Sequence, residues 1–426
     1  MSFLRICVIY MMLGQLPLTL YGDFGGFDYG QMFLLGPQRD AATAARTGFL
    51  CASVPDVPDG TPRAFPSSAD RTCPSHAKFR VRGGGGTGNG FSDDCAARQR
   101  TLDATASCLA GIRGCQLPDG AFAQVAPGGN ASAPVWVAPY FANFAALALL
   151  AGHRHTPHPE DLARVSRWLT WCVGHQASGG YWTDFEGTSA SYSDTGKVDA
   201  WDSSAALFLS VLAGYRRAGG EVQSAWFDAA RRASACLEAL ADKDGLTWAK
   251  PDYRVKFLMD NIEVCVGWRS AAEIFAAAGA AADAGRARSH ADRLISFSLP
   301  GYWQSGAGRF SHARLADGTL APAGAKSYPY GLAQLYGIAF VHPYGAAWLS
   351  VNRAYHPDTG PSAAFGPEWW LVAASVVSED DARLWRPRVC EAVAAFDPAR
   401  TYLHRYALSA LALLDGAQWL QSNNVP

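Results

Sequence analysis

The sequence lacks an excess of charge of either sign. Its 36 Lys and Arg residues nearly balance 37 Asp and Glu residues, so the net charge is -1, and only 17% of the 426 residues are charged. A general affinity for nucleic acid or anionic lipid is not expected, because no surplus of cations is present to replace phosphate counterions.

Long apolar runs are scarce as well. Residues 1–22 contain an apolar stretch that Pro17 interrupts and that is short for a membrane span, and no other segment is long enough to cross a bilayer. These residues are interpreted either as a secretory signal peptide or as a stray apolar N-terminus. The first interpretation predicts a secreted or periplasmic protein and the second a cytoplasmic one.

The ten cysteines form no CxxC pair and show no spacing typical of metal ligands. The sequence therefore predicts no metal site and no cofactor. A histidine-rich stretch, GHRHTPH at residues 152–158, has no carboxylate or cysteine partner in its sequence pattern and does not change this prediction.

Apolar and aromatic residues are plentiful. The hydrophobic fraction is 49%, and the chain has 14 Trp, 16 Tyr and 21 Phe residues. Such a chain can bury a large core, and its many aromatic rings suit a large neutral or weakly charged ligand.

Two regions follow the N-terminal stretch. Residues 23–95 are rich in Gly, Pro and Ser without sustained periodicity, which predicts a poorly ordered extension. From residue 96 to about residue 420 the periodicity is helical and predicts one all-α domain. The predicted helices are 96–115, 139–152, 159–175, 199–218, 223–241, 260–279, 283–297, 328–340, 342–355, 367–377, 379–396 and 402–416.

The predicted helices alternate in kind. Segment 159–175 has one apolar stripe and one charged side, whereas segment 199–218 is apolar almost all round. A helix that is apolar on every side must be buried on every side. The alternation therefore predicts two concentric layers, with six helix pairs closing into an (α/α)6 barrel. Pro387 is expected to kink or break the helix that contains it.

The buried helices share polar or aromatic first turns. Because they run parallel to one another in such a ring, these beginnings are expected to meet at one end, which we call the mouth. Asp199 with Asp202, and Asp260 with Glu263, repeat an i, i+3 spacing that places each pair on one helical face. A carboxylate among apolar neighbours, as at Asp202 and Glu263, is costly to bury, so it is expected to have a hydrogen-bonding partner or a functional role.

The helix alternation, with GGYWTDF, VDAWDSSAALFL, DGLTWAKPDY, MDNIEV, SYPYG and PEWW at the mouth, resembles the six-hairpin (α/α)6-barrel glycosidases. The resemblance covers residues 96–420. It implies hydrolysis of a poly- or oligosaccharide by a protonated carboxylic acid and a second carboxylate, with inversion favoured. Glu263 is the candidate acid, Asp202 the candidate base and Asp184 the reserve base.

Further residues at the mouth are candidates for substrate binding. Asp199 and Asp260 are expected to orient sugar hydroxyls or the catalytic pair, and Lys250, Lys256 and Arg405 to recognise an anionic substituent. Flat aromatic faces can pack against pyranose C–H groups. The remaining candidates are Tyr140, Trp182, Trp201, Trp248, Trp303, Tyr328, Glu368, Trp369, Trp370 and His404.

Two alternatives stay open. An epimerase or lyase on the same barrel would use His404 with Tyr328 or Tyr330 for proton abstraction. A non-catalytic carbohydrate-binding protein would keep its ligand affinity when Asp202 and Glu263 are replaced by amides.

Overall fold

A computed structural model describes residues 90–322, 324, 327–341, 345–355 and 366–421. The predicted N-terminal stretch 1–22 and nearly all of the extension 23–95 lie outside this part of the chain. Cys51, Cys73 and the glycine-rich run up to residue 89 lie outside it too.

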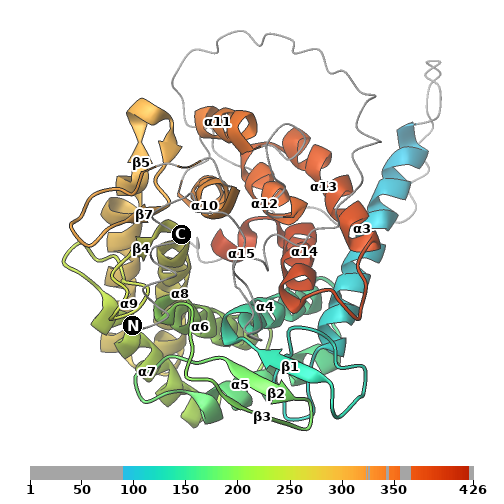
Figure 1. The fold of residues 1–426 in the computed structure, drawn as a ribbon, viewed down its shortest axis with the longest axis horizontal. Coiled ribbons are helices and arrows are strands. Elements are labelled where there is room, and N and C mark those ends of the chain that lie inside the picture. The colour runs from blue at the N-terminus through green and yellow to red at the C-terminus, as the bar shows by residue number, and fades with distance from the viewer. Residues whose placement is uncertain (1–89, 323, 325–326, 342–344, 356–365, 422–426) are drawn as a thin grey trace, which may run out of the picture.

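Within the described residues, six helices form an inner ring in which each contacts the next and the last contacts the first. Figure 1 shows them around the centre of the molecule. They are α4 (Pro139–His155), α6 (Trp201–Arg217), α8 (Leu258–Ala277), α10 (Leu332–Phe340), α12 (Pro367–Val377) and α14 (Leu403–Asp415).

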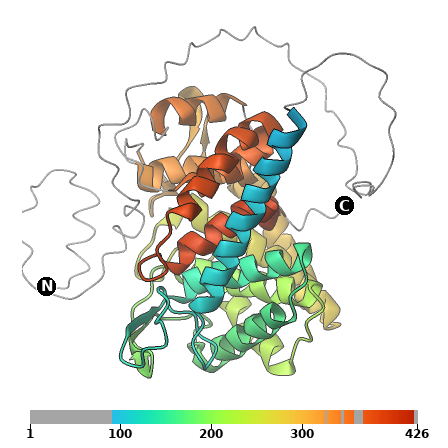
Figure 2. The ribbon, with the colours of Figure 1, turned by 90° about the vertical axis from the view of Figure 1, so that its right-hand side faces the viewer.

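The other long helices pack outside this ring (Figures 1 and 2). They are α3 (Gly90–Gly114), α5 (Pro159–His175), α7 (Ser224–Leu240), α9 (Ala281–Arg293), α11 (Gly345–Tyr355) and α13 (Glu379–Ala394). Outer and inner helices alternate along the chain, and α3 lies along α13 and α14 (Figure 2). The all-α class and the (α/α)6 barrel are thus confirmed.

The burial of each helix follows its sequence pattern. Inner helix α6 buries every residue from Asp202 to Ala213, whereas outer helix α7 buries spaced positions such as Trp226, Ala230 and Leu237. An all-round apolar helix can satisfy the hydrophobic effect only inside the ring, and a one-sided helix covers it from outside.

The ring closes where α14 meets α4. At the ends of these helices away from the mouth, the Asp415 carboxylate pairs with Arg154, and its Oδ1 lies 3.0 Å from His155 Nε2. These partners are 261 and 260 positions apart in the sequence.

Helices α6 and α8 approach each other closely at Gly267. A Cβ atom at this position would lie 2.6 Å from the Ala206 Cα and 2.9 Å from its carbonyl oxygen. We expect Gly267→Ala to lower the free energy of unfolding by about 1–3 kcal/mol, because backbone atoms cannot give way cheaply. Chemical unfolding followed by tryptophan fluorescence measures this loss.

Gly285 in outer helix α9 provides the matched control. No atom lies within 4 Å of a Cβ built there, so Gly285→Ala should stabilise the protein by up to about 1 kcal/mol through helix propensity. Equal effects of the two substitutions would contradict the close packing of α6 on α8.

Short antiparallel strands occupy the connections that lead into inner helices. Strands β1 (Pro134–Val137), β2 (Phe185–Thr188) and β3 (Ser191–Asp194) form one sheet, in which Trp136 lies opposite Glu186. The pairs β4 (Lys256–Phe257) with β7 (Ala313–Arg314), and β5 (Trp303–Gln304) with β6 (Arg309–Phe310), are shorter still. These strands, which the periodicity did not predict, brace the mouth.

Several expected helix ends differ in the structure. Helix α3 begins at Gly90, before residue 96, and α6 begins at Trp201, so Asp199 lies outside it. A kink or a break was expected at Pro387, and the helix does not break there, because α13 continues through this residue. Pro387 lies exposed on an outer helix, where water can replace the lost backbone hydrogen bond.

Candidate active site

A cavity opens on the barrel axis at the mouth. Every inner helix, or the segment that leads into it, contributes at least one side chain to its wall. The cavity volume is about 40 Å³, and about 560 Å³ is free of protein atoms when the part open to solvent is counted. The lining residues are Tyr140, Phe141, Phe144, Asp199, Ala200, Met259, Asp260, Tyr328, Leu332, Tyr336, Trp369 and Leu408.

Asp199 and Asp260 are the carboxylates in this wall. Asp260 is the third residue of α8 and is half-buried; burial and the nearby charges of Asp202, Glu263 and Asp199 raise its pKa well above the ordinary value. Asp199 is exposed at the mouth, yet the surrounding protein displaces enough of its hydration to raise its pKa, with Lys250 opposing the shift. Two acids from neighbouring inner segments therefore face one cavity.

Glu263 lies one helical turn beyond Asp260 and is buried behind two of the lining tyrosines. Its Oε1 accepts hydrogen bonds from Tyr336 Oη at 2.9 Å and from Tyr140 Oη at 3.1 Å. Burial raises the pKa of Glu263 to about 8, although the hydroxyls of Ser203 and both tyrosines oppose the rise. The carboxyl group is thus protonated at neutral pH and fixes the two tyrosine hydroxyls at the cavity wall.

The raised pKa of Glu263 predicts a pH-dependent stability. The folded state holds this proton up to about pH 8, whereas the unfolded chain releases it near the ordinary value of about 4.3. Stability from this group is therefore complete at low pH and decreases as the pH rises toward 8. Between pH 5 and pH 7 the loss should be roughly 2 kcal/mol.

The measurement compares unfolding at pH 5 and pH 7 in the parent protein and in Glu263→Gln. The amide can still accept from both tyrosines but cannot ionise, so the variant should lose roughly 2 kcal/mol of the pH dependence. An unchanged pH dependence would show that Glu263 keeps an ordinary pKa.

Asp202 and Asp184 lie behind the cavity wall. Asp202 is fully buried, with Oδ2 accepting from Thr247 Oγ1 at 2.7 Å and Oδ1 from the Ser203 amide at 2.8 Å. Burial raises the pKa of Asp202 to about 7 and that of Asp184 to about 8, and Asp184 Oδ2 lies 3.3 Å from Trp136 Nε1. The expected i, i+3 pairing of Asp199 with Asp202 is corrected, because Asp199 precedes the helix.

The predicted aromatic faces divide into three groups. Tyr140, Tyr328 and Trp369 line the cavity. Trp182 and Trp370 do not, because both are buried in the core, where Trp182 Nε1 donates to the Cys172 carbonyl and Trp370 stacks on Trp385 of outer helix α13 at 4.8 Å. These two residues are corrected from substrate platforms to core residues.

The other predicted tryptophans are half-buried around the mouth without lining the cavity. Trp201 stacks on Tyr181 at 3.6 Å, Trp248 lies under the Lys256 ammonium at 4.1 Å, and Trp303 packs edge-on against Phe310.

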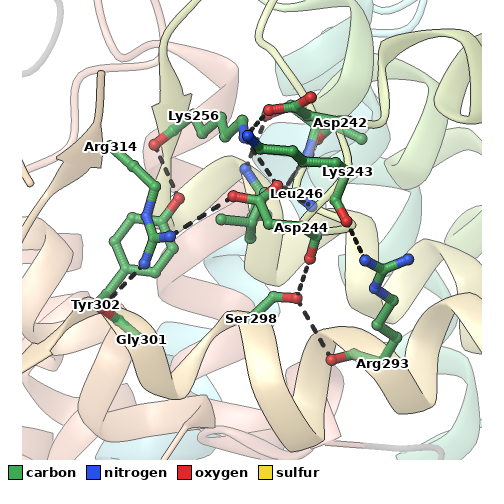
Figure 3. A network of polar contacts seen from close by, with 12 residues as sticks. Asp242, Lys243, Asp244, Leu246, Lys256, Arg293, Ser298, Gly301, Tyr302 and Arg314 are labelled. Atoms are coloured by element: carbon green, nitrogen blue, oxygen red, sulfur yellow. Dashed lines mark hydrogen bonds and ion pairs between the residues drawn. The ribbon is translucent and has the colours of Figure 1, made fainter. Parts of the chain in front are cut away.

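The predicted cationic residues have protein partners. Lys250 Nζ donates to the Val198 carbonyl at 3.1 Å and lies close enough to Asp199 to oppose its pKa shift. Lys256 is only 2% exposed and pairs with Asp242 and Asp244 at 2.7 and 2.8 Å, as Figure 3 shows. The expected role of Lys256 in binding an anionic substituent is therefore wrong.

Glu368, Arg405 and His404 also differ from expectation. Arg405 Nε lies 3.3 Å from Glu368 Oε1 in a largely buried ion pair that is absent from the cavity lining. His404 is buried beside Phe141, and burial lowers its pKa to about 3. The placement of these three residues in a substrate site is corrected, because none of them lines the cavity.

The sequence analysis missed several lining residues, among them Phe144, Leu332 and Tyr336. A signal for them was present. Phe144 follows Tyr140 by four positions, and Leu332 and Tyr336 follow Tyr328 by four and eight, which is the spacing of one helical face. Extending each predicted mouth residue along its stripe would have found them.

In the part of the chain that the structure describes, no group of three His, Cys, Asp or Glu side chains is arranged to hold a metal ion. The same part contains no helix with the length and apolar character of a membrane span.

No protein-family model matches the sequence, and no curated protein sequence matches it. Solved structures with similar folds include a D-mannose isomerase, 13% identical, with a TM-score of 0.48 over 68% of this chain and 84% of that one. A glucoamylase from Saccharomycopsis fibuligera is 9% identical, with a TM-score of 0.49 over 78% of this chain and 96% of its own. A rhamnosidase from Klebsiella oxytoca, with rhamnose bound, is 14% identical, with a TM-score of 0.49 over 74% and 63%. Because these values are low, the function is inferred from the cavity itself.

Proposed function

We propose that this protein is a glycosidase that hydrolyses an oligo- or polysaccharide in the cavity at the mouth. One observation carries the proposal: Asp199 and Asp260 enter from neighbouring inner segments and line a single cavity whose other walls are mostly aromatic. Carboxylates supply the acid and base of glycoside hydrolysis, and aromatic faces pack against sugar rings.

Asp260 is assigned as the general acid and Asp199 as the base. The pKa of Asp260 is held well above the ordinary value by burial and by three neighbouring carboxylates, so it keeps the proton that the leaving oxygen needs. Burial raises the pKa of Asp199, and Lys250 opposes this rise; in its ionised form Asp199 can accept a proton from water. This assignment moves the catalytic pair from Glu263 and Asp202 to the residues that line the cavity.

Inversion is part of the proposal. Inverting glycosidases place their two carboxyl groups roughly 6.5–9.5 Å apart, with water between them. Acids on neighbouring inner segments fit this requirement better than two acids on one helical turn.

Glu263 is assigned to a supporting role. Its hydrogen bonds fix Tyr140 and Tyr336, whose rings form part of the sugar-binding wall. Asp184 and Asp202 remain behind the wall, where burial raises the pKa of each carboxyl group.

An epimerase or lyase that depends on His404 is less well supported. That imidazole is buried against Phe141, and its pKa of about 3 leaves it a weak base.

The test is a screen of the purified protein for release of reducing ends from neutral and anionic oligosaccharides. Hydrolysis of at least one linkage class is expected. Products that are epimerised or unsaturated, without any new reducing end from water addition, would replace the glycosidase proposal with the alternative chemistry.

A further inference from the structure

The last described helix lies inside the barrel. Helix α15 (Gln418–Gln421) contacts α8, α10 and α14, and Figure 1 shows it at the centre of the inner ring. It follows α14, which begins at the mouth and ends at the other end of the barrel. The chain therefore turns back and enters the barrel from the end opposite the mouth.

The turn between α14 and α15 is built against α12. Gly416 has φ 54° and ψ -122°, a conformation that strains other residues, and a Cβ there would lie 2.5 Å from Ser375 Oγ. The Ala417 amide donates to the same Ser375 Oγ at 3.0 Å, and the Ser375 hydroxyl donates to the Val372 carbonyl at 2.7 Å. A glycine and a serine together thus fix the direction of α15.

Helix α15 brings Trp419 against the back of the cavity wall. The Trp419 ring lies 5.5 Å from Phe144 and 5.9 Å from Trp369, centroid to centroid, and both of these residues line the cavity. Trp419 and Leu420 are themselves buried. Trp419 does not itself line the cavity; it lies behind these two rings, on the side of the cavity away from the mouth.

We propose that this site is a blind pocket that admits one end of a saccharide chain, so that the enzyme removes terminal units and does not cut within the chain. The inference rests on the proposed function. A chain cannot pass along the axis while α15 and Trp419 occupy it, and the two catalytic carboxylates lie in the cavity wall on the mouth side of Trp419. Only a chain end can bring its linkage between them.

Hydrolysis of that linkage breaks the bond from the anomeric carbon to the bridging oxygen. Asp260 gives its proton to this oxygen, the hydroxyl of water bonds to the anomeric carbon, and the remaining proton of the water passes to Asp199. The released terminal unit leaves by the mouth.

The experiment follows product sizes from a linear oligosaccharide that the enzyme cleaves. The same oligosaccharide, capped first at one end and then at the other, serves as the matched substrate. From the earliest time points we expect only the terminal unit and the chain shortened by that unit, and capping one particular end should stop the reaction. Early fragments of intermediate length, or cleavage of a substrate capped at both ends, would overturn the blind pocket while leaving the glycosidase proposal intact.

Failure of the glycosidase proposal gives a different result: no saccharide in the panel is cleaved. Binding of saccharides of increasing length to the Asp260→Asn variant then still distinguishes a blind pocket from an open groove. Affinity that stops increasing after the terminal sugar units is expected of a pocket closed at one end, whereas affinity that keeps rising with chain length contradicts it.

Substitutions of Trp419 test directly whether this residue closes the pocket. Trp419→Ala should lower kcat/KM for the terminal unit by about tenfold or more, because Phe144 and Trp369 lose the ring that holds them in place in the cavity wall. Trp419→Phe, which keeps a ring against Phe144 and Trp369, should restore most of this loss. Equal activity of all three proteins overturns the role of Trp419; if the alanine variant does not fold, the product sizes from the parent protein decide the question.

Discussion

Replacement of Asp260 by asparagine is expected to reduce kcat about 10²–10⁴-fold on any saccharide that the protein hydrolyses. The amide keeps the size and polarity of the side chain at the cavity wall but carries no proton for the leaving oxygen. Initial rates on a natural glycoside, measured together with KM, test this expectation, and KM should change little because binding to the aromatic wall is retained.

Asp228→Asn supplies the control. Asp228 lies exposed on outer helix α7, where it pairs with Arg231, so the same chemical change there should leave the rate unaltered. If Asp260→Asn stays active while Glu263→Gln is inactive, the acid is Glu263 and the assignment made from the cavity lining is wrong.

The largest expected effect on stability concerns the ion pairs of Lys256. The ammonium is 2% exposed and reaches two carboxylates, those of Asp242 and Asp244, in the network of Figure 3. It also lowers the pKa of Asp242. We expect the double variant Asp242→Asn, Asp244→Asn to lose roughly 3–5 kcal/mol of unfolding free energy, because a buried cation is left without a counter-charge.

Adding Lys256→Met to that double variant should recover most of the loss. The methionine fills similar space and needs no counter-charge, while the Trp248 ring remains available for packing. Chemical unfolding of the parent, the double variant and the triple variant completes the cycle. A triple variant as unstable as the double variant would show that the asparagines, and not the unpaired ammonium, cause the loss.

The architecture was predictable because the helices of both layers have a sequence pattern that shows how they are buried. All-round apolar segments such as α6 can only be interior, and their one-sided neighbours can only be exterior. Parallel inner helices then require their starts to converge, which is why Tyr140, Asp260 and Trp369 line one cavity.

The assignment within the site was less predictable because it depends on single positions. Asp199 faces the cavity since α6 begins two residues later, and a shift of two residues rotates a side chain by more than half a helical turn. Trp182 and Trp369 have the same side chain, and only the packing of their elements buries the first in the core and places the second at the cavity. Helix α15 has only four residues, so its sequence shows no helical periodicity from which it could have been predicted.

The contact of Asp415 with Arg154 and His155 has a consequence for the way the chain is made. These groups join the first inner helix to the last, so the apolar side of α4 has no neighbour on one flank until α14 has left the ribosome. Contacts over such sequence distances form slowly, and the exposed flank of an unfinished barrel can bind other unfinished chains. Early folding of the first hairpins therefore yields an open arc, and a closed ring forms only after synthesis of the last hairpin.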